Sequence, residues 1–200
     1  MMGRRRTWRH LLEVWMRVTL AALLSAFATG APALAQSNLR ELAVARLALV
    51  QAISSDPVVI GALRAKNASG ESFQDIRRKD AEWSQNPQAP LRKELAGNNC
   101  AQRLRELTKN DPVVVEVILM DRNGANVCVS RETSDYWQGD EEKFQKTYQE
   151  GRDIFLGEAA FDQSAGVYAL QLNALVRDGD SKAGALTLSL RVKRQELTGR

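Results

Sequence analysis

The stretch that decides the fold is Asp111–Ser130, D-P-V-V-V-E-V-I-L-M-D-R-N-G-A-N-V-C-V-S. Its two β-rich runs, Val113–Met120 and Ala125–Ser130, flank Asn123-Gly124. Asn-Gly tolerates positive φ at both central positions of a type I′ turn, so between such runs it is a strong signal for a β-hairpin. We therefore expect a hairpin with a two-residue loop here. In that hairpin two pairs of residues face each other, Met120 with Val127 and Leu119 with Cys128.

Helices are predicted before this hairpin, and one helix and three strands after it. Before it, apolar residues recur at intervals of three and four, as on the buried face of a helix. Asp56 and Pro57 mark one helix start, because Asp is a good N-cap and Pro loses no hydrogen bond at the first helical position. The expected helices are Ser37–Ser54, Val58–Ala65, Ser72–Trp83, a helix from Leu91 to before Asn110 that breaks at Gly97-Asn98-Asn99, and one capped by Asp140 and running to Gln149; the expected strands are Asp153–Ala160, Gly166–Val176 and Ala183–Val192.

The last two predicted strands each have an apolar face and a mixed face. Residues such as Leu172 and Leu188 fall on the apolar face, which is typical of a buried core. The mixed face carries polar residues on both strands. Such a face either meets solvent, as in many antiparallel sheets, or forms the floor of a polar pocket whose groups need partners. The polar residues in question are Gln171, Asn173, Thr187 and Ser189.

Residues 1–35 have the layout of a secretory signal peptide. A basic start, Arg4-Arg5-Arg6, precedes the apolar run Val18–Ala28, and small residues surround a cleavage site after Ala35. We expect this segment to be removed from a single domain over 36–200, which would then be periplasmic. The alternative is an uncleaved segment that anchors the protein to the inner membrane, although its uncharged run is marginal for the roughly 20 residues that a span needs.

The charge balance argues against nucleic acid as a partner. The chain holds 28 basic and 24 acidic residues, but residues 1–35 contribute five arginines and one glutamate, which leaves 23 of each elsewhere. The predicted domain therefore has no net positive charge with which to bind a polyanion.

Export also bears on the two cysteines. In an oxidising compartment an even pair is usually a disulfide, so we expect Cys100 and Cys128 to be bonded. The alternative is two buried free thiols.

Enzymatic activity is not expected. The one histidine, His10, lies in the predicted signal peptide, so the mature chain cannot form a Ser-His or Cys-His pair or a histidine-bearing zinc site. Asp140 and Glu142 could act as paired carboxylates in glycoside hydrolysis, but acids are also common at a helix N-terminus. The acidic cluster from Asp135 to Glu142 lacks the spacing of a calcium loop. We predict no cofactor and no metal site.

The order of elements resembles the single Cache domain, the extracellular PAS-like (PDC) sensor of bacterial chemoreceptors and histidine kinases. Asp56-Pro57 after the first helix carries part of this resemblance. The rest is carried by V-I-L-M-D-R-N-G-A-N-V-C-V-S (117–130), D-Y-W-Q-G-D-E-E-K-F (135–144) and G-E-A-A-F-D-Q-S-A-G-V-Y-A-L-Q (157–171). The resemblance implies an α+β fold with a five-stranded antiparallel sheet in the order 2-1-5-4-3, a long N-terminal helix on one face and flanking short helices. Receptor members continue from the fifth strand into a transmembrane helix, whereas this chain ends soon after that strand.

The resemblance also implies a ligand site on the other face of the sheet, roofed by the segment from Arg131 to Phe144. Tyr136 and Trp137 would form its walls, or alternatively close the edge of the core. Arg131 or Lys143 would meet a carboxylate, or alternatively stay solvated. Two further residues complete the implied site: Asp162, which would meet an amine or else start a turn, and Gln171, which would lie on the floor.

Two functional hypotheses follow. In the first, the protein is a periplasmic sensor domain without an output module, which binds a small molecule of amino-acid or carboxylate type and signals through a separate membrane-bound partner. In the second, it is a protein–protein interaction module of the cell envelope that binds no metabolite, for which an exposed apolar patch would be the signature.

Overall fold

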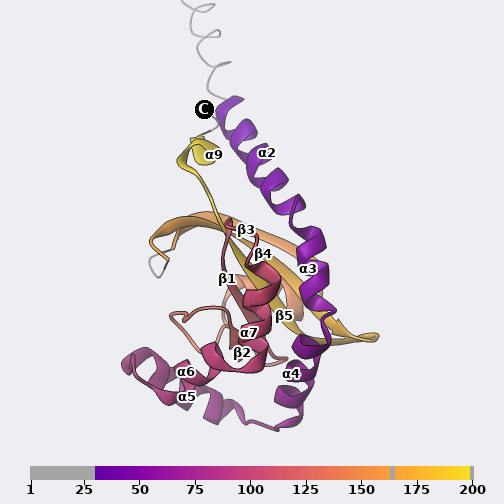
Figure 1. Ribbon diagram of the computed structural model, residues 1–200, viewed down its shortest axis with the longest axis vertical. Coiled ribbons are helices and arrows are strands. Elements are labelled where there is room, and N and C mark those ends of the chain that lie inside the picture. Colours follow the sequence, from indigo (N-terminus) through magenta and orange to yellow (C-terminus); the bar gives the residue numbers. More distant parts are fainter. Residues whose placement is uncertain (1–29, 163–164, 199–200) are drawn as a thin grey trace, which may run out of the picture. The chain divides into compact units, whose positions relative to one another are not determined.

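The computed structural model describes residues 30–162 and 165–198 (Figure 1). Residues Glu41–Lys193 form one compact unit, and the described parts of residues 1–40 and 194–200 belong to a second. The predicted signal peptide over residues 1–35 falls mostly on residues 1–29, outside the described residues, as does His10. The predicted domain boundary therefore stays a prediction.

The described elements follow the predicted order. The helices are α2 (Gly30–Val44), α3 (Leu47–Ser54), α4 (Pro57–Ala68), α5 (Phe73–Gln85), α6 (Pro90–Gly97), α7 (Asn99–Thr108), α8 (Glu142–Phe144), the π-helix η1 (Gln145–Gln149) and α9 (Arg194–Thr198); the strands are β1 (Val114–Met120), β2 (Asn126–Val129), β3 (Ile154–Asp162), β4 (Val167–Asp178) and β5 (Ser181–Arg191).

The strands form one antiparallel sheet in the order β2-β1-β5-β4-β3. This confirms the predicted α+β class and strand order. Leu172 of β4 pairs with Leu188 of β5, and Gln171 pairs with Ser189 in the next row. The alternation read from the sequence therefore places the apolar and polar rows as expected.

The hairpin between β1 and β2 differs from the expectation in its turn. Leu119 faces Cys128 as predicted, but Met120 faces Asn126 rather than Val127, because a bulge follows Leu119. Gly124 has a φ of +80°, and every described residue with a positive φ is a glycine. Asn123 therefore has a negative φ, so the turn is not type I′, which needs a positive φ at both central residues. The cause is Asp121, whose Oδ1 accepts hydrogen bonds from the backbone N–H groups of Asn123 (2.8 Å) and Ala125 (2.9 Å).

Helix boundaries follow capping residues, with two corrections. Asp56 caps α4 as predicted, since its Oδ1 accepts from the N–H groups of Val58 (2.9 Å) and Val59 (3.3 Å). The predicted helix Ser37–Ser54 is broken at Arg46. The guanidinium of Arg46 donates to the Leu42 carbonyl (3.1 Å), while its backbone N–H donates to the Ala43 carbonyl (2.9 Å). The N-cap of α8 is Glu141, not Asp140.

The sheet of the larger unit is covered on both faces. Helices α3 and α4 contact β4 and β5, and α3 runs alongside the sheet in Figure 1. On the other face, Phe144 packs with Ile118, Met120 and Ala185. In the polar row on this face, Asn173, Thr187 and Ser189 are buried, and Gln171 is half-buried.

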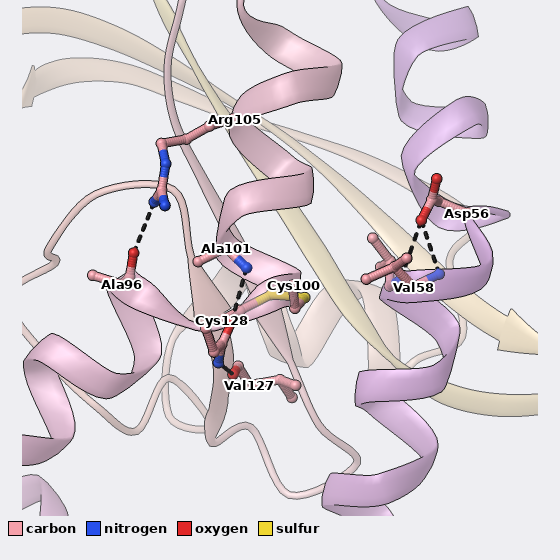
Figure 2. Close-up of a disulfide and its surroundings, with 10 residues drawn as sticks. Asp56, Val58, Ala96, Cys100, Ala101, Arg105, Val127 and Cys128 are labelled. Atoms are coloured by element: carbon pink, nitrogen blue, oxygen red, sulfur yellow. Dashed lines mark hydrogen bonds between the residues drawn. A yellow bond between two sulfur atoms is a disulfide. The ribbon is translucent and has the colours of Figure 1, made fainter.

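The predicted disulfide between Cys100 and Cys128 is present and joins α7 to β2 (Figure 2). Hydrogen bonds reinforce the same junction. The Asn98 side chain accepts from the Ala101 N–H (2.8 Å) and donates to the Val127 carbonyl (3.1 Å). Asn98 is the N-cap of α7, so the predicted break between the two helices is also the point where they meet the hairpin.

Within the described residues, no single helix has the length and apolar composition to cross a membrane. The segments Ala35–Ser54 and Pro57–Ala68 pass that test only when taken together, and they are bent by 63° at the break between them.

Candidate functional site

A pocket of about 300 Å³ lies on the polar face of the sheet. Strands β1, β3 and β4 supply its floor and one side, and the segment between β2 and α8, together with Lys143 of α8, supplies the rest. This is the face and the roof segment that the resemblance implied. Its lining residues are Glu116, Thr133, Ser134, Glu141, Lys143, Glu158, Ala160, Phe161, Asp162, Ala169 and Gln171.

Beside the pocket, the polar face of the sheet carries a buried hydrogen-bond network. The Thr187 hydroxyl donates to Asn173 Oδ1 at 2.8 Å, and the Asn173 amide donates to the carbonyl oxygens of Phe155 and Gln171 at 3.2 Å each. Asn173 and Thr187 are both fully buried. Their partners lie within the sheet, so this network orders the floor and leaves Gln171, one row further, in the pocket lining.

Glu116 is the exception on the floor. Glu116 is only 5% exposed, and its Oε1 has no hydrogen-bond partner. The Ser189 hydroxyl lies 3.5 Å from Oε2, which is a long contact. Burial raises the pKa of Glu116 to about 7, against the opposing effect of Lys143 and with a further increase from Asp162. Glu116 thus presents an unsatisfied carboxyl group to the pocket.

Lys143 reaches the pocket from the short helix α8. Its side chain is 6% exposed, and its Nζ lies 3.0 Å from Glu141 Oε2. The Thr147 hydroxyl stabilises the backbone of this turn, because it donates a hydrogen bond to the Lys143 carbonyl at 2.6 Å. Lys143 therefore enters the pocket already paired with a carboxylate.

Asp162 lies at the end of β3, on the pocket rim. Its Oδ1 accepts a hydrogen bond from the Ala165 N–H at 3.1 Å, and its carbonyl accepts from the Gly166 N–H at 2.8 Å. Asp162 therefore organises the turn into β4, which was the alternative role, while it also lines the pocket.

The structure places Tyr136 and Trp137 away from this pocket. Tyr136 is fully buried among Ile76, Trp83, Leu95 and Ala125. The Trp137 ring lies against Phe73 and the Arg77 guanidinium, with ring centroids 5.4 Å apart and the guanidinium carbon 4.7 Å from the ring. Their positions agree with the alternative interpretation, in which these two residues close the edge of the core.

Asp80 of α5 explains why the aromatic pair turns that way. Its Oδ1 accepts hydrogen bonds from the backbone N–H groups of both Tyr136 (3.2 Å) and Trp137 (3.0 Å). Trp137 also forms a backbone bridge with Ala125 beside the hairpin turn. The segment is therefore anchored to α5 and the hairpin before it crosses the polar face.

Arg131 lines a separate pocket of about 360 Å³ beside the end of β2, together with Arg105 and Lys109. Its charge nevertheless acts on Glu116, whose pKa it lowers slightly against the larger effect of burial. The structure therefore brings three of the six implied ligand residues into one pocket, and these are Lys143, Asp162 and Gln171.

Sequence reasoning missed Glu116, Glu158 and Thr133 in the lining. A signal for Glu116 existed, because it is the one charged residue inside the apolar run V-V-V-E-V-I-L-M (113–120). A buried strand rarely carries an ionisable side chain without a purpose or a partner. Glu158 and Thr133 have no comparable local signal.

A larger pocket, of about 650 Å³, lies between α3, α4 and the β3–β4 edge. Two ion pairs lie on its rim, Arg64 with Asp178 and Arg177 with Asp153. Among the described residues, no group of three or more His, Cys, Asp or Glu side chains is arranged to hold a metal ion.

No protein-family model matches the chain, and no curated protein matches it. Among solved structures, the sensor domain of the histidine kinase DctB of V. cholerae matches with a TM-score of 0.43 and 16% identity over 90% of this chain and 60% of that one. The ligand-binding domain of the Campylobacter jejuni chemoreceptor Tlp3, in complex with L-valine, matches with a TM-score of 0.41 and 16% identity over 80% of this chain and 64% of that one. An extracellular ligand binding receptor from Desulfohalobium retbaense matches with a TM-score of 0.38 and 19% identity over 66% of this chain and 24% of that one.

The chain thus spans between 24% and 64% of the length of these three structures. Other similar structures include the extracellular domains of two putative histidine kinases.

Proposed function

We propose that this protein is a periplasmic sensor domain that binds a small molecule on the polar face of its sheet and catalyses no reaction. The observation that carries the proposal is the pocket that Glu116, Lys143, Asp162 and Gln171 line beneath the segment joining β2 to α8. A sheet face that only needed to be buried would be expected to carry apolar residues there, because polar groups cost free energy when water is withdrawn from them.

The pocket has the construction of a binding site rather than of a packing defect. Its floor is held by the buried Asn173–Thr187 hydrogen bond, and its roof segment is anchored at Tyr136 and Trp137 by Asp80. The buried Oε1 of Glu116 has no hydrogen-bond partner among the described residues, so a ligand could satisfy it. Preformed polar groups in a cavity of this size are what small-molecule sites use to orient a ligand.

A thermal-shift screen of the purified protein with small amines, amino acids and carboxylates tests the proposal. A ligand that binds the folded state raises Tm in a concentration-dependent way. Gln171→Ala should abolish the shift given by any hit. Gln88→Ala, at an exposed position outside the pocket, is the matched control and should retain it. A silent screen, or a hit that both variants bind equally, would contradict the proposed site.

The second half of the proposal is that a separate membrane-bound partner reads the bound state. Chemical crosslinking in whole cells, followed by identification of the captured protein with and without the ligand, tests it. We expect one membrane protein whose capture depends on the ligand.

A protein–protein interaction module without a metabolite is the second candidate, and one observation favours it. Phe161 and Tyr168 are 55% and 45% exposed on β3 and β4, and their rings meet edge to face with centroids 5.4 Å apart. Strand β3 is an edge strand, where another chain could add. Tyr168→Ser would weaken a partner's binding under this hypothesis and leave small-molecule binding unchanged, because Tyr168 is the member of this ring pair that does not line the pocket.

A further inference from the structure

The pocket on the polar face is lined by more negative than positive groups. Four carboxyl groups line it, from Glu116, Glu141, Glu158 and Asp162, against the ammonium group of Lys143. Arg131 adds a second positive charge that acts on Glu116, but the carboxyl groups still outnumber the two cations, so the potential inside the pocket favours a cation.

The positive charge of Lys143 is compensated before any ligand arrives. Its Nζ lies 3.0 Å from Glu141 Oε2, and its side chain is 6% exposed. Arg131, the other cation implied for a carboxylate, lines a different pocket. Within the described lining, a ligand carboxylate would thus meet Glu116, Glu158 and Asp162 with no uncompensated cation to receive it.

Glu116 supplies the second, independent observation. Only 5% of Glu116 is exposed, and its Oε1 has no hydrogen-bond partner. Oε2 has only the 3.5 Å contact with the Ser189 hydroxyl. A buried carboxyl oxygen of this kind costs free energy unless a donor reaches it, and a ligand N–H would be such a donor.

We propose that the ligand of this site is a small organic cation, an amine or ammonium compound without a carboxylate, and that the Glu116 carboxylate meets its charge. This inference rests on the proposed function and narrows its ligand class. It departs from the amino-acid or carboxylate ligand expected from the sequence. Asp162 and Glu158 line the β3 side of the same pocket and add to the negative field there.

Binding of a cation is coupled to a proton on Glu116. Burial raises the pKa of Glu116 to about 7, with Lys143 and Arg131 opposing the increase and Asp162 adding to it. Glu141 and Glu158 also face the pocket, the first through its pair with Lys143. A bound cation favours the ionised form, so a proton leaves as the ligand enters and affinity rises with pH. Because the ionised fraction of Glu116 is about tenfold larger at pH 8 than at pH 6, we expect the affinity for a cation to be about tenfold higher at pH 8.

Isothermal titration calorimetry tests the ligand class with three sets of probes. The cations are tetramethylammonium, butylamine and 1,4-diaminobutane; the anions are butyrate and succinate; the zwitterions are glycine and L-valine. We expect at least one cation to bind, and to bind more tightly at pH 8 than at pH 6. Tetramethylammonium has no titratable proton, so its pH dependence would report on the protein alone. Binding of anions or zwitterions without any cation would overturn this inference and leave the proposed function standing, whereas no binding by any set would contradict both.

Variants separate Glu116 from the general field. Glu116→Gln keeps the shape and removes the charge, and should weaken cation binding at pH 8 by about tenfold or more and remove its pH dependence. Glu82→Gln, an exposed position on α5 outside the lining, is the matched control and should bind as the unaltered protein does. Glu158→Gln is a second lining variant at an exposed strand position, and should weaken binding by a smaller factor. Unchanged affinity and pH dependence in folded Glu116→Gln would overturn the assignment.

Discussion

The phenolic oxygen of Tyr136 lies 2.9 Å from Oε2 of Glu71 and donates a hydrogen bond to it. The Lys66 ammonium group lies between the same partners, 2.7 Å from the phenol and 2.6 Å from the carboxylate. Burial raises the pKa of Tyr136, and the Glu71 charge raises it further, so the phenol remains a donor. This triad joins the segment that roofs the pocket to α4 and to the loop between α4 and α5.

Tyr136→Phe removes one member of the triad without a change of ring volume. Because the Glu71 carboxylate and the Lys66 ammonium group then each lose a buried partner, we expect a loss of about 1–3 kcal/mol in the free energy of unfolding. Urea denaturation measures it. Tyr168→Phe, at an exposed ring, is the control and should change stability by less than about 0.5 kcal/mol. Ligand affinity should stay the same, whereas a selective loss of affinity would restore Tyr136 to the wall of the site.

Glu71 predicts a dependence of stability on acid pH. Burial alone would raise the pKa of Glu71, but hydrogen bonds from Lys66, Lys79 and Tyr136 outweigh it and lower that pKa below its usual range. The folded state therefore holds the ionised carboxylate more strongly than the unfolded chain does. Its stabilising contribution is present above the unfolded pKa, about 4.5, and is lost as pH falls through the lower folded pKa. Glu71→Gln should be less stable than the unaltered protein at pH 7, and this difference should shrink below pH 4.

Glu116 predicts the opposite pH dependence in a higher window. Its folded pKa of about 7 exceeds the unfolded value of 4.5, so between these values the folded state keeps a proton that the unfolded chain has lost. Stability therefore falls as pH rises from 4.5 to 7 and levels off above that. At pH 8 Glu116→Gln should be more stable than the unaltered protein by about 3 kcal/mol, and at pH 5 by much less. Urea titrations at both pH values measure this, and equal differences at the two would contradict a buried, proton-binding Glu116.

The sheet could be predicted from the sequence because its determinants are local. The alternation of Leu172 and Leu188 with Gln171 and Ser189 assigned each strand its two faces, and the pairing of β4 with β5 confirms both rows. The predicted type I′ turn of the hairpin was wrong, because the Asp121 side chain accepts hydrogen bonds from the turn backbone and overrides the preference of Asn-Gly.

The site could be predicted only in part, because its remaining determinants are not local. Lys143 reaches the pocket because the roof crosses the polar face, as the resemblance implied, and Gln171 lies on that face in β4. Tyr136 and Trp137 are drawn away by Asp80, and Tyr136 also by Glu71; these partners lie more than 50 residues earlier in the chain. No spacing in the sequence reveals pairs at that separation.

The Cys100–Cys128 disulfide predicts a stability that depends on oxidation. It joins residues separated by 28 positions, and closing a loop of that size removes enough entropy from the unfolded chain to stabilise the fold by about 3–4 kcal/mol. Urea denaturation with and without a phosphine reductant should show this loss. In the double variant Cys100→Ser, Cys128→Ser, the reductant should have no effect. An equal effect of reductant on both proteins would contradict the assignment.

Gly184 on β5 lies where any side chain would strike the neighbouring strand. A Cβ there would lie 2.1 Å from the Met120 carbonyl oxygen and 2.9 Å from Leu63 Cδ1, and the first of these is backbone that cannot move without shifting β1. We expect Gly184→Ala to lower the free energy of unfolding by about 3 kcal/mol, as overpacking in a core does. Gly61→Ala is the matched control, because a Cβ at that position of α4 meets nothing within 4 Å, and alanine should stabilise the helix by about 0.5–1 kcal/mol. Urea denaturation compares the two, and equal effects would mean that β1 and β5 do not approach as closely as the Met120–Gly184 contact requires.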